Sequence, residues 1–402
     1  MADPEEVGYR DPICRSEEHR MDSTRTARLM AGIPAHNNSL FHRVQFNVGD
    51  PAAWIEIDGS TTMLLRDIEV HRAREHATVD AVTCPAEHEP PGGLSGDRET
   101  ATAQAVAELL RARGITRVVV DRSLPMSFAH ELTAVGIELS YDAQMGVAER
   151  RAKSSAELAA LRTAQSDTEA AMEMACRLVA GAEAAADGSL RVGDETLTSE
   201  RVRHAIDTFL LERNYSNPAS IVACGPQCAD CHEVGTGPLR TGETVIIDIF
   251  PRNRSSLYNG DCTRTVVHGE ISDEIRAIHA AVVDAKAKAI AVVRAGVTGE
   301  DVHQATIASL EAAGWPVGPP SDEPAADFVG MVHGTGHGVG LDVHEPPLLD
   351  LKGPPLVVGD VLTIEPGLYG KSVGGVRIED MVSVTESGCE NFNRLPEGLD
   401  WS

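Results

Sequence analysis

The sequence predicts a mixed α/β (α+β) chain of two domains, of which the larger, C-terminal domain contains an internal duplication. The first third shows a strand–helix–strand pattern, and the remainder runs twice through a long helix, a short helix and strands. The length of 402 residues also exceeds the size at which one hydrophobic core usually stops growing.

The N-terminal part is predicted to be an irregular arm followed by a small α/β domain. Residues 1–44 carry many charges and little periodicity, so we expect no regular structure there. The domain at residues 45–150 is predicted to contain one helix, which ends at Gly114, and a loop around the ProProGlyGly sequence. Strand-like runs flank these features at residues 53–57, 61–68 and 117–120.

The C-terminal domain is expected over residues 154–397. Ser154 and Glu157 have capping-box spacing and open a long amphipathic helix that ends near Gly181. A shorter helix at residues 200–212 follows, with Ser199 as its predicted cap. The same order then recurs, with predicted helices at residues 273–294 and 300–313. Two such halves suggest a functional site between them.

Composition restricts the partners that we expect. A hydrophobic fraction of 42% with 24% charged residues is typical of a soluble globular protein. A net charge of -26 argues against nucleic acid or an anionic membrane as partner, because both favour Lys and Arg. The charged N-terminus lacks the apolar core of a signal peptide, and no apolar run approaches the ~18 residues of a membrane span. We therefore expect a cytoplasmic protein with reduced cysteines.

The most informative feature is a series of potential metal ligands in the last third of the chain. Four carboxylates and one imidazole form an oxygen-rich set that suits first-row divalent cations such as Mn²⁺. Because carboxylates can bridge, five side chains suffice for a pair of cations about 3.5–4 Å apart, which hydrolases use to activate water. The five residues are Asp248, Asp261, His337, Glu365 and Glu379.

The sequence around the carboxylates predicts how they meet. Asp248 interrupts an apolar strand, where a buried carboxylate costs several kcal/mol unless it is paired or metal-bound. A hairpin through residues 251–256 would bring it to Asp261, although a strand-end cap or a turn residue explains each aspartate alone. A second hairpin, with Gly374 and Gly375 in its turn, would join Glu365 to Glu379.

The histidines lie in a glycine-rich segment. His333 and His337 stand in HisGlyThrGlyHis, where the glycines favour an extended or looped segment that closely approaches another group. A phosphate-binding loop is disfavoured because no helix follows. His344 lies seven residues beyond His337, so a bulge or turn is needed for both side chains to face one centre. Arg377 is either a salt-bridge partner of its neighbouring carboxylate or a substrate-binding residue.

A competing signal is the C-x-x-C-H sequence at Cys228, Cys231 and His232, the form of a c-type haem attachment site. Covalent haem attachment requires export, for which the sequence shows no signal. Cys224 adds a third thiol, which leaves a zinc site or disulfide exchange as further alternatives.

Taken together, the motifs Asp-x-Thr-Arg-Thr, His-Gly-x-x-His, Glu-Pro-Gly and Arg-Ile-Glu-Asp resemble the pita-bread metallopeptidases, the creatinase/aminopeptidase/prolidase family. They look most like Xaa-Pro aminopeptidases and Xaa-Pro dipeptidases (prolidases). The resemblance covers residues 153–395, and the smaller domain is similar to the creatinase-type domain that precedes the catalytic domain in these enzymes. The separation of Asp248 and Asp261 is longer than the commonest family spacing.

The resemblance implies a role for each residue. Asp248 would bind one metal, Asp261 and Glu379 would bridge both, and His337 and Glu365 would complete the other. The two divalent ions would be Mn²⁺, with Co²⁺ or Zn²⁺ as alternatives. Glu365 would also be the general base. The remaining site residues would assist the intermediate, contact the proline side of the substrate, or orient the site: His232, His333, His344 and Arg377, with Tyr369 as a weaker candidate.

The implied activity is hydrolysis of the Xaa-Pro bond at the N-terminus of peptides or dipeptides by a hydroxide that bridges the metals. The partner would be a peptide with proline at its second position, and the enzyme a homodimer. A family member that hydrolyses a small non-peptide amide is the first alternative. A non-catalytic binding protein with a vestigial site is the second.

Overall fold

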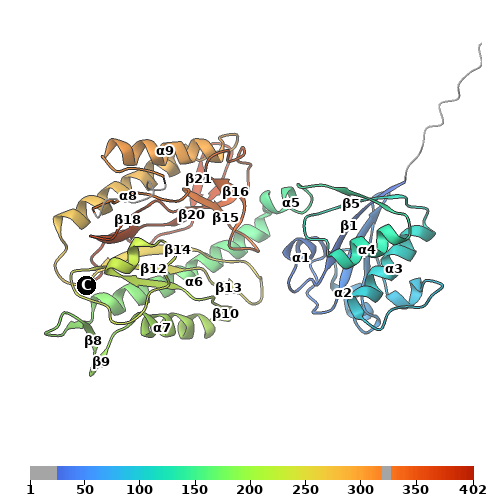
Figure 1. The fold of residues 1–402 in the computed structure, drawn as a ribbon, viewed down its shortest axis with the longest axis horizontal. Helices are drawn as coiled ribbons and strands as arrows, with labels where there is room; N and C mark the ends of the chain where they lie inside the picture. The colour runs from blue at the N-terminus through green and yellow to red at the C-terminus, as the bar shows by residue number, and fades with distance from the viewer. Residues whose placement is uncertain (1–24, 319–326) are drawn as a thin grey trace, which may run out of the picture. The chain divides into compact units, whose positions relative to one another are not determined.

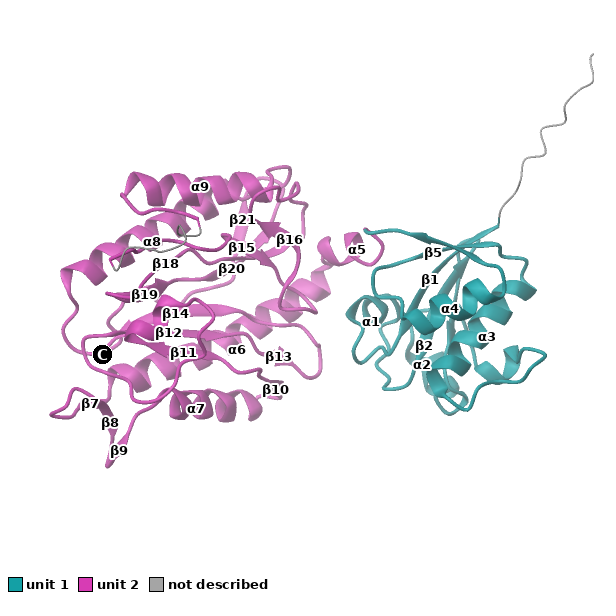
Figure 2. Ribbon diagram, in the orientation of Figure 1, with its two compact units in different colours: residues 1–143 teal, residues 144–402 magenta. Residues whose placement is uncertain are grey.

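The computed structural model describes residues 25–318 and 327–402 and divides the chain into two compact units, residues 1–143 and 144–402 (Figure 2). Residues 1–24 of the predicted arm lie outside the described residues. None of the described helices is both long enough and apolar enough to cross a membrane.

The first unit is built on a six-stranded sheet with the order β4-β3-β2-β1-β5-β6. The strands are β1 (Thr26–Gly32), β2 (Ala52–Ile57), β3 (Ser60–Leu64), β4 (Ala81–Thr83), β5 (Arg117–Val120) and β6 (Glu138–Tyr141). The helices are α1 (Asn38–Val44), α2 (Val70–His76), α3 (Arg98–Ala112) and α4 (Met126–Ala134), with short 3-10 turns at Asp67–Glu69 and Pro85–His88. Helices α3 and α4 pack on the sheet through a core that includes Leu29, Ile55, Val106, Leu110 and Phe128.

The prediction of an irregular arm is wrong for residues 26–32 and 38–44, which form β1 and α1. Strand β1 is central in the sheet, antiparallel to β2 and parallel to β5. Its last four residues are all buried, so the strand lacks the alternation of apolar and polar residues that marks a half-buried strand. Its partner β5 lies about 90 positions further along the chain, beyond the reach of a local pattern.

The second unit contains the two predicted halves. Helices α6 (Ser155–Ala180) and α7 (Ser199–Leu211) belong to the first half, and α8 (Asp273–Val292) and α9 (Gly299–Ala312) to the second. The capping box predicted at Ser154 is present. The cap of α7 is Thr198 rather than the predicted Ser199, because the Thr198 hydroxyl accepts the Arg201 N–H.

The sheets of the second unit lie between its two helix pairs, with α6 and α7 on one side and α8 and α9 on the other (Figure 1). One sheet has the order β11-β12-β14, a second β16-β15-β17-β20-β21, and β18 and β19 form a hairpin. Their bounds are β11 (Ile221–Cys224), β12 (Thr244–Ile249), β14 (Cys262–Val267), β15 (Gly336–Gly338), β16 (Glu345–Leu349), β17 (Val361–Ile364), β18 (Gly367–Gly370), β19 (Gly374–Arg377), β20 (Asp380–Val384) and β21 (Cys389–Asn391).

Smaller elements complete this unit. Strands β7 (Glu183–Ala184), β8 (Leu190–Val192) and β9 (Glu195–Thr196) form a separate sheet, and β10 (Tyr215–Ser216) pairs with β13 (Arg252–Asn253). A 3-10 turn spans Gly225–Ala229. The first unit ends at residue 143 and not at the predicted residue 150, and helix α5 (Ala148–Arg151) groups with the second unit. The reason is electrostatic, since Arg150 pairs with Asp342 and Glu345, and Arg151 with Asp360.

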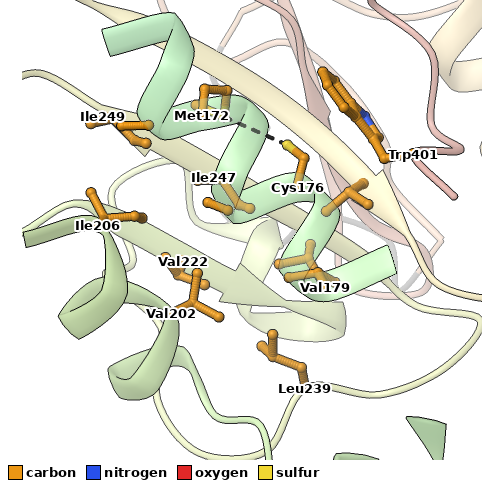
Figure 3. Packing of buried hydrophobic residues seen from close by; sticks show 14 of the residues in the cluster. Met172, Cys176, Val179, Val202, Ile206, Val222, Leu239, Ile247, Ile249 and Trp401 are labelled. Carbon is orange, nitrogen blue, oxygen red and sulfur yellow. Dashed lines mark hydrogen bonds between the residues drawn. The ribbon is translucent and has the colours of Figure 1, made fainter. Parts of the chain in front are cut away.

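Apolar packing fixes each helix pair on its sheet. In the first half, the residues that join α6 and α7 to β11 and β12 include Met172, Cys176, Val179, Val202, Ile206, Val222, Ile247 and Ile249, with Trp401 beside them (Figure 3). In the second half, Val302 and Ala289 of the helices pack against Leu362 and Val382 of the sheet. A fully buried side chain of this size contributes about 1.5–3 kcal/mol, so the two sheets are held rigidly against their helices.

A substitution at Gly260 tests how tightly the segment before β14 packs against α6. An added Cβ there would lie 2.1 Å from Thr168 Oγ1 and 2.8 Å from the Ala164 carbonyl oxygen. We expect Gly260→Ala to lower the free energy of unfolding by about 1–3 kcal/mol, the usual cost of overpacking. Gly388→Ala is the matched control, because its Cβ would meet nothing within 4 Å. Equal thermal midpoints for the two variants would contradict the packing described here.

Candidate metal centre

The β12–β14 pair places the two aspartates. Asp248 lies on β12 directly opposite Thr263, and Asp261 immediately precedes β14. The predicted hairpin is therefore present. Its connecting loop contains β13, which pairs with β10, so the lengthened segment is used in a separate strand pair.

The two glutamates are placed by strands β17 and β20. Glu365 directly follows β17 and Glu379 directly precedes β20, and the neighbouring residues Ile364 and Asp380 face each other in the antiparallel pair. The β18–β19 hairpin lies between them in the chain, as predicted, although Gly374 and Gly375 begin β19 instead of forming the centre of the turn.

His337 lies on β15 with the bulge that its spacing to His344 requires. The register of β15 against β16 shifts between His337 and Gly338, and the two imidazole rings lie 4.2 Å apart, edge to face. The flanking glycine Gly336 allows a close approach, because a Cβ there would lie 2.1 Å from the Thr363 carbonyl oxygen. The expected extended, closely packed histidine segment is therefore present.

All nine predicted site residues line a single cavity of about 360 Å³ in the second unit. They come from both halves of the unit, so the cavity lies where the two halves meet. The set comprises His232, Asp248, Asp261, His333, His337, His344, Glu365, Arg377 and Glu379.

The predicted ligands are close enough to share cations. Within the described part of the chain, ligand atoms of Asp261, His337 and Glu379 lie within 4.8 Å of one another. His337 Nε2 is 3.3 Å from Glu365 Oε1 and 3.8 Å from Asp261 Oδ2. Asp248 Oδ1 is buried and has no hydrogen-bond partner. A buried carboxylate oxygen without a hydrogen-bond donor is available as a metal ligand, so this donor set is suited to divalent metals.

Burial and mutual repulsion make the ionised carboxylates costly. The pKa values of Asp261 and Glu379 lie well above their ordinary range because burial disfavours the charged form and the neighbouring carboxylates repel it. Burial also raises the pKa of Glu365. A bound cation is the group that removes this cost.

Burial also favours the neutral form of three of the histidines. It lowers the pKa values of His333, His337 and His344. Neutral His337 can offer a ring nitrogen to a metal, as ligands must be deprotonated. Neutral His344 can donate an N–H to a developing negative charge.

Hydrogen bonds from threonine hydroxyls orient the carboxylates of two predicted metal ligands. The Thr263 hydroxyl donates to Glu379 Oε2 at 2.7 Å, and the Thr363 hydroxyl to Glu365 Oε1 at 3.1 Å. Both threonines lie two residues from a predicted ligand in an extended segment, so period-two spacing could have identified them in the sequence. Gln165 of α6, which bonds the Asp261 backbone at both its N–H and its carbonyl, gave no such signal.

Arg377, Tyr369 and His333 are joined by a chain of hydrogen bonds, which we call the relay. Arg377 donates through Nη2 to Asp248 Oδ2 at 2.7 Å, so its carboxylate partner is Asp248 and not the neighbouring Glu379. Its Nη1 donates to the Tyr369 hydroxyl at 3.1 Å, and this hydroxyl lies 2.7 Å from His333 Nε2. Since His333 Nδ1 faces the Gly334 carbonyl oxygen at 2.7 Å, the proton sits on Nδ1 and Tyr369 donates to Nε2.

The three clustered cysteines have separate surroundings. The Cys224 thiol faces Glu243, and the buried Cys228 thiol donates to the Ala223 carbonyl oxygen. Cys231 lies 3.8 Å from His232 Nδ1 and lines the cavity. The cysteines that the structure describes are free thiols, so no disulfide joins them there.

The fold and the cavity together define a class: a metallopeptidase of the pita-bread fold. The model of metallopeptidase family M24 matches residues 160–386, and the chain belongs to this family. The resemblance seen in the sequence motifs is thereby confirmed, as is the predicted fold class.

Similarity to individual proteins agrees with the family. The chain is 31% identical to the Xaa-Pro dipeptidase of Pyrococcus furiosus over 57% of this chain and 62% of that protein. It is 30% identical to Xaa-Pro aminopeptidase 1 of Streptomyces coelicolor over 77% and 65%. It is 35% identical to the uncharacterized peptidase YqhT of Bacillus subtilis over 44% and 47%. The chain thus spans about half to two thirds of the length of the curated relatives it matches.

Solved structures share the fold along nearly the whole chain. A Xaa-Pro dipeptidase from Bacillus anthracis matches with a TM-score of 0.75 at 22% identity, covering 93% of this chain and 94% of that one. Dipeptidase PepE from Mycobacterium ulcerans matches with a TM-score of 0.71 at 27% identity, covering 94% and 92%.

The relay through Tyr369 predicts a measurable contribution to stability. Tyr369→Phe removes one acceptor of the buried Arg377 Nη1 and the donor to the half-buried His333 Nε2, and a buried group that loses its partner costs about 1–3 kcal/mol. We expect the free energy of unfolding in urea to fall by that amount. Tyr141→Phe is the control, because its side chain is exposed. A Tyr369→Phe protein as stable as the Tyr141→Phe protein would contradict the relay.

Proposed function

We propose that the protein is a metal-dependent aminopeptidase that hydrolyses the bond before a proline at the second position of a peptide. The observation that carries the proposal is the convergence of nine residues from two chain halves on one cavity. The names of the relatives, Xaa-Pro dipeptidase and Xaa-Pro aminopeptidase, support the choice of substrate.

Two divalent cations, in our proposal Mn²⁺, would be held by Asp248, Asp261, His337, Glu365 and Glu379. When bound, they supply positive charge that polarises the scissile carbonyl and lowers the pKa of water. The oxygen-rich donor set favours Mn²⁺ over softer cations.

The side chains of the protein carry out the proton transfers. Glu365, with Oε1 held by Thr363, is placed to accept a proton from the attacking water. The same carboxyl group can pass this proton to the proline nitrogen, which must be protonated before it leaves. His344 and His232 are the candidate donors to the oxygen of the tetrahedral intermediate, where a preorganised N–H is most effective.

The cavity also offers a surface for the proline ring. Ile221, Phe250, Val343 and Leu348 contribute apolar side chains to its lining. A pyrrolidine ring has no hydrogen-bonding group to satisfy, so apolar contacts of this kind suit it. Arg377 is a positioning residue in this scheme, because it fixes Asp248 and Tyr369.

The activity is tested with Ala-Pro-Ala and, as a control, Ala-Ala-Ala. We expect the wild-type protein with Mn²⁺ to release alanine from the first peptide, and a chelator to abolish the release. Glu365→Gln is expected to lower kcat by about 10²–10⁴-fold, the range for a lost general base.

The matched control is Glu390→Gln, which alters an exposed salt bridge with Arg162 and leaves the cavity unchanged. We expect it to retain the wild-type kcat. Metal-loaded protein that cleaves neither peptide would contradict the proposed function.

A further inference from the structure

The charges that line the cavity are almost all negative. Besides the four predicted carboxylate ligands, Asp350 contributes a fifth acid to the lining. Of the described lining residues, Arg377 is the one Lys or Arg. Two divalent cations would balance the negative charge of the four carboxylate ligands. Asp350 and Arg377 then set the net charge of the part of the cavity that lies beyond the metals.

The Arg377 guanidinium is hydrogen-bonded to other groups of the protein. The side chain is buried, and four hydrogen bonds engage all three of its guanidinium nitrogens. The acceptors are Thr263 Oγ1, the Cys231 carbonyl oxygen, the Tyr369 hydroxyl and Asp248 Oδ2. These acceptors take four of the five guanidinium N–H groups, so a substrate carboxylate could form a two-point ion pair with Arg377 only by displacing one of them.

Apart from Arg377, the lining residues that the structure describes include no Lys or Arg, so they offer no second cationic side chain at the accessible edge of the cavity. Leu348 of β16 lines it with an apolar side chain that is 56% exposed. Asp350, two residues further on, is half exposed, and its Oδ1 lies 3.5 Å from His303 Nε2. This edge therefore presents an apolar group and an acid to an arriving peptide.

The position of a peptide's C-terminal carboxylate depends on its length. In a dipeptide the carboxylate is attached to the proline itself, whose nitrogen belongs to the scissile bond, so it enters the cavity. Each further residue moves it outward by about 3.3–3.6 Å. A carboxylate inside the cavity without a cationic partner loses its hydration and is repelled by Asp350.

We propose that this site selects peptides of three or more residues over dipeptides, and that Leu348 is a specificity-determining position. The inference rests on the proposed function and deepens it, because it chooses between an aminopeptidase and a dipeptidase. The relatives named above include both kinds, so the cavity lining and not the similarity supports the choice.

Three substrates distinguish the effect of peptide length from that of the C-terminal negative charge: Ala-Pro, its amide Ala-Pro-NH₂, and Ala-Pro-Ala. The assay is run with Mn²⁺ at about pH 8, where an imidazole of ordinary pKa is uncharged and cannot replace a guanidinium as partner. We expect kcat/KM for Ala-Pro to be at least about tenfold below that for both other substrates, as for a charge left unpaired on binding.

Leu348→Arg adds the missing cation at an exposed position, with Leu348→Gln as the control for size and polarity. We expect Leu348→Arg to raise the ratio of kcat/KM for Ala-Pro to kcat/KM for Ala-Pro-NH₂ by about tenfold, whereas Leu348→Gln leaves this ratio at its wild-type value. Wild-type protein that cleaves Ala-Pro as efficiently as its amide would overturn the inference while the proposed function stands. Cleavage of none of the three substrates would overturn both.

Discussion

The concentration of negative charge in one buried cavity is the constraint on which the rest of this structure depends. Asp261 and Glu379 are almost fully buried, and Asp248 and Glu365 line the same space. Such a group of carboxylates stays ionised only if positive charge lies beside it. Arg377 supplies one charge through Asp248, and the predicted metals would supply the others.

A second buried ionic network holds the strands that carry the ligands. Arg264 of β14 donates to the Glu379 carbonyl oxygen at 2.5 Å and to Asp380 Oδ1 at 2.9 Å, and Lys286 of α8 donates to Asp380 Oδ2 at 2.5 Å. Burial opposes ionisation of Asp380, but the two cations hold its pKa below the ordinary value. This network joins the two halves of the unit directly behind the cavity, so ligand positions in one half are fixed relative to those in the other.

The sequence revealed the site better than it revealed the scaffold. Asp248 was found because a carboxylate interrupts an apolar strand, and His337 because glycines surround it; both signals are local. Strand β1 could not be predicted because its partner β5 is far away in the sequence. Its buried residues also lack the alternation of apolar and polar side chains that marks a half-buried strand. Asp350 gave no sign in the sequence of its role at the cavity edge, since an exposed acid in a loop has no pattern of its own. The partner of Arg377 also required the fold, because Asp248 is 129 positions away.

We propose that the cavity holds a pair of divalent cations. Anomalous diffraction from a crystal of the protein grown with Mn²⁺ tests it most directly, because it locates each manganese independently of activity. We expect two peaks about 3.5–4 Å apart, surrounded by Asp248, Asp261, His337, Glu365 and Glu379. A single peak, or none among these five side chains, would contradict it.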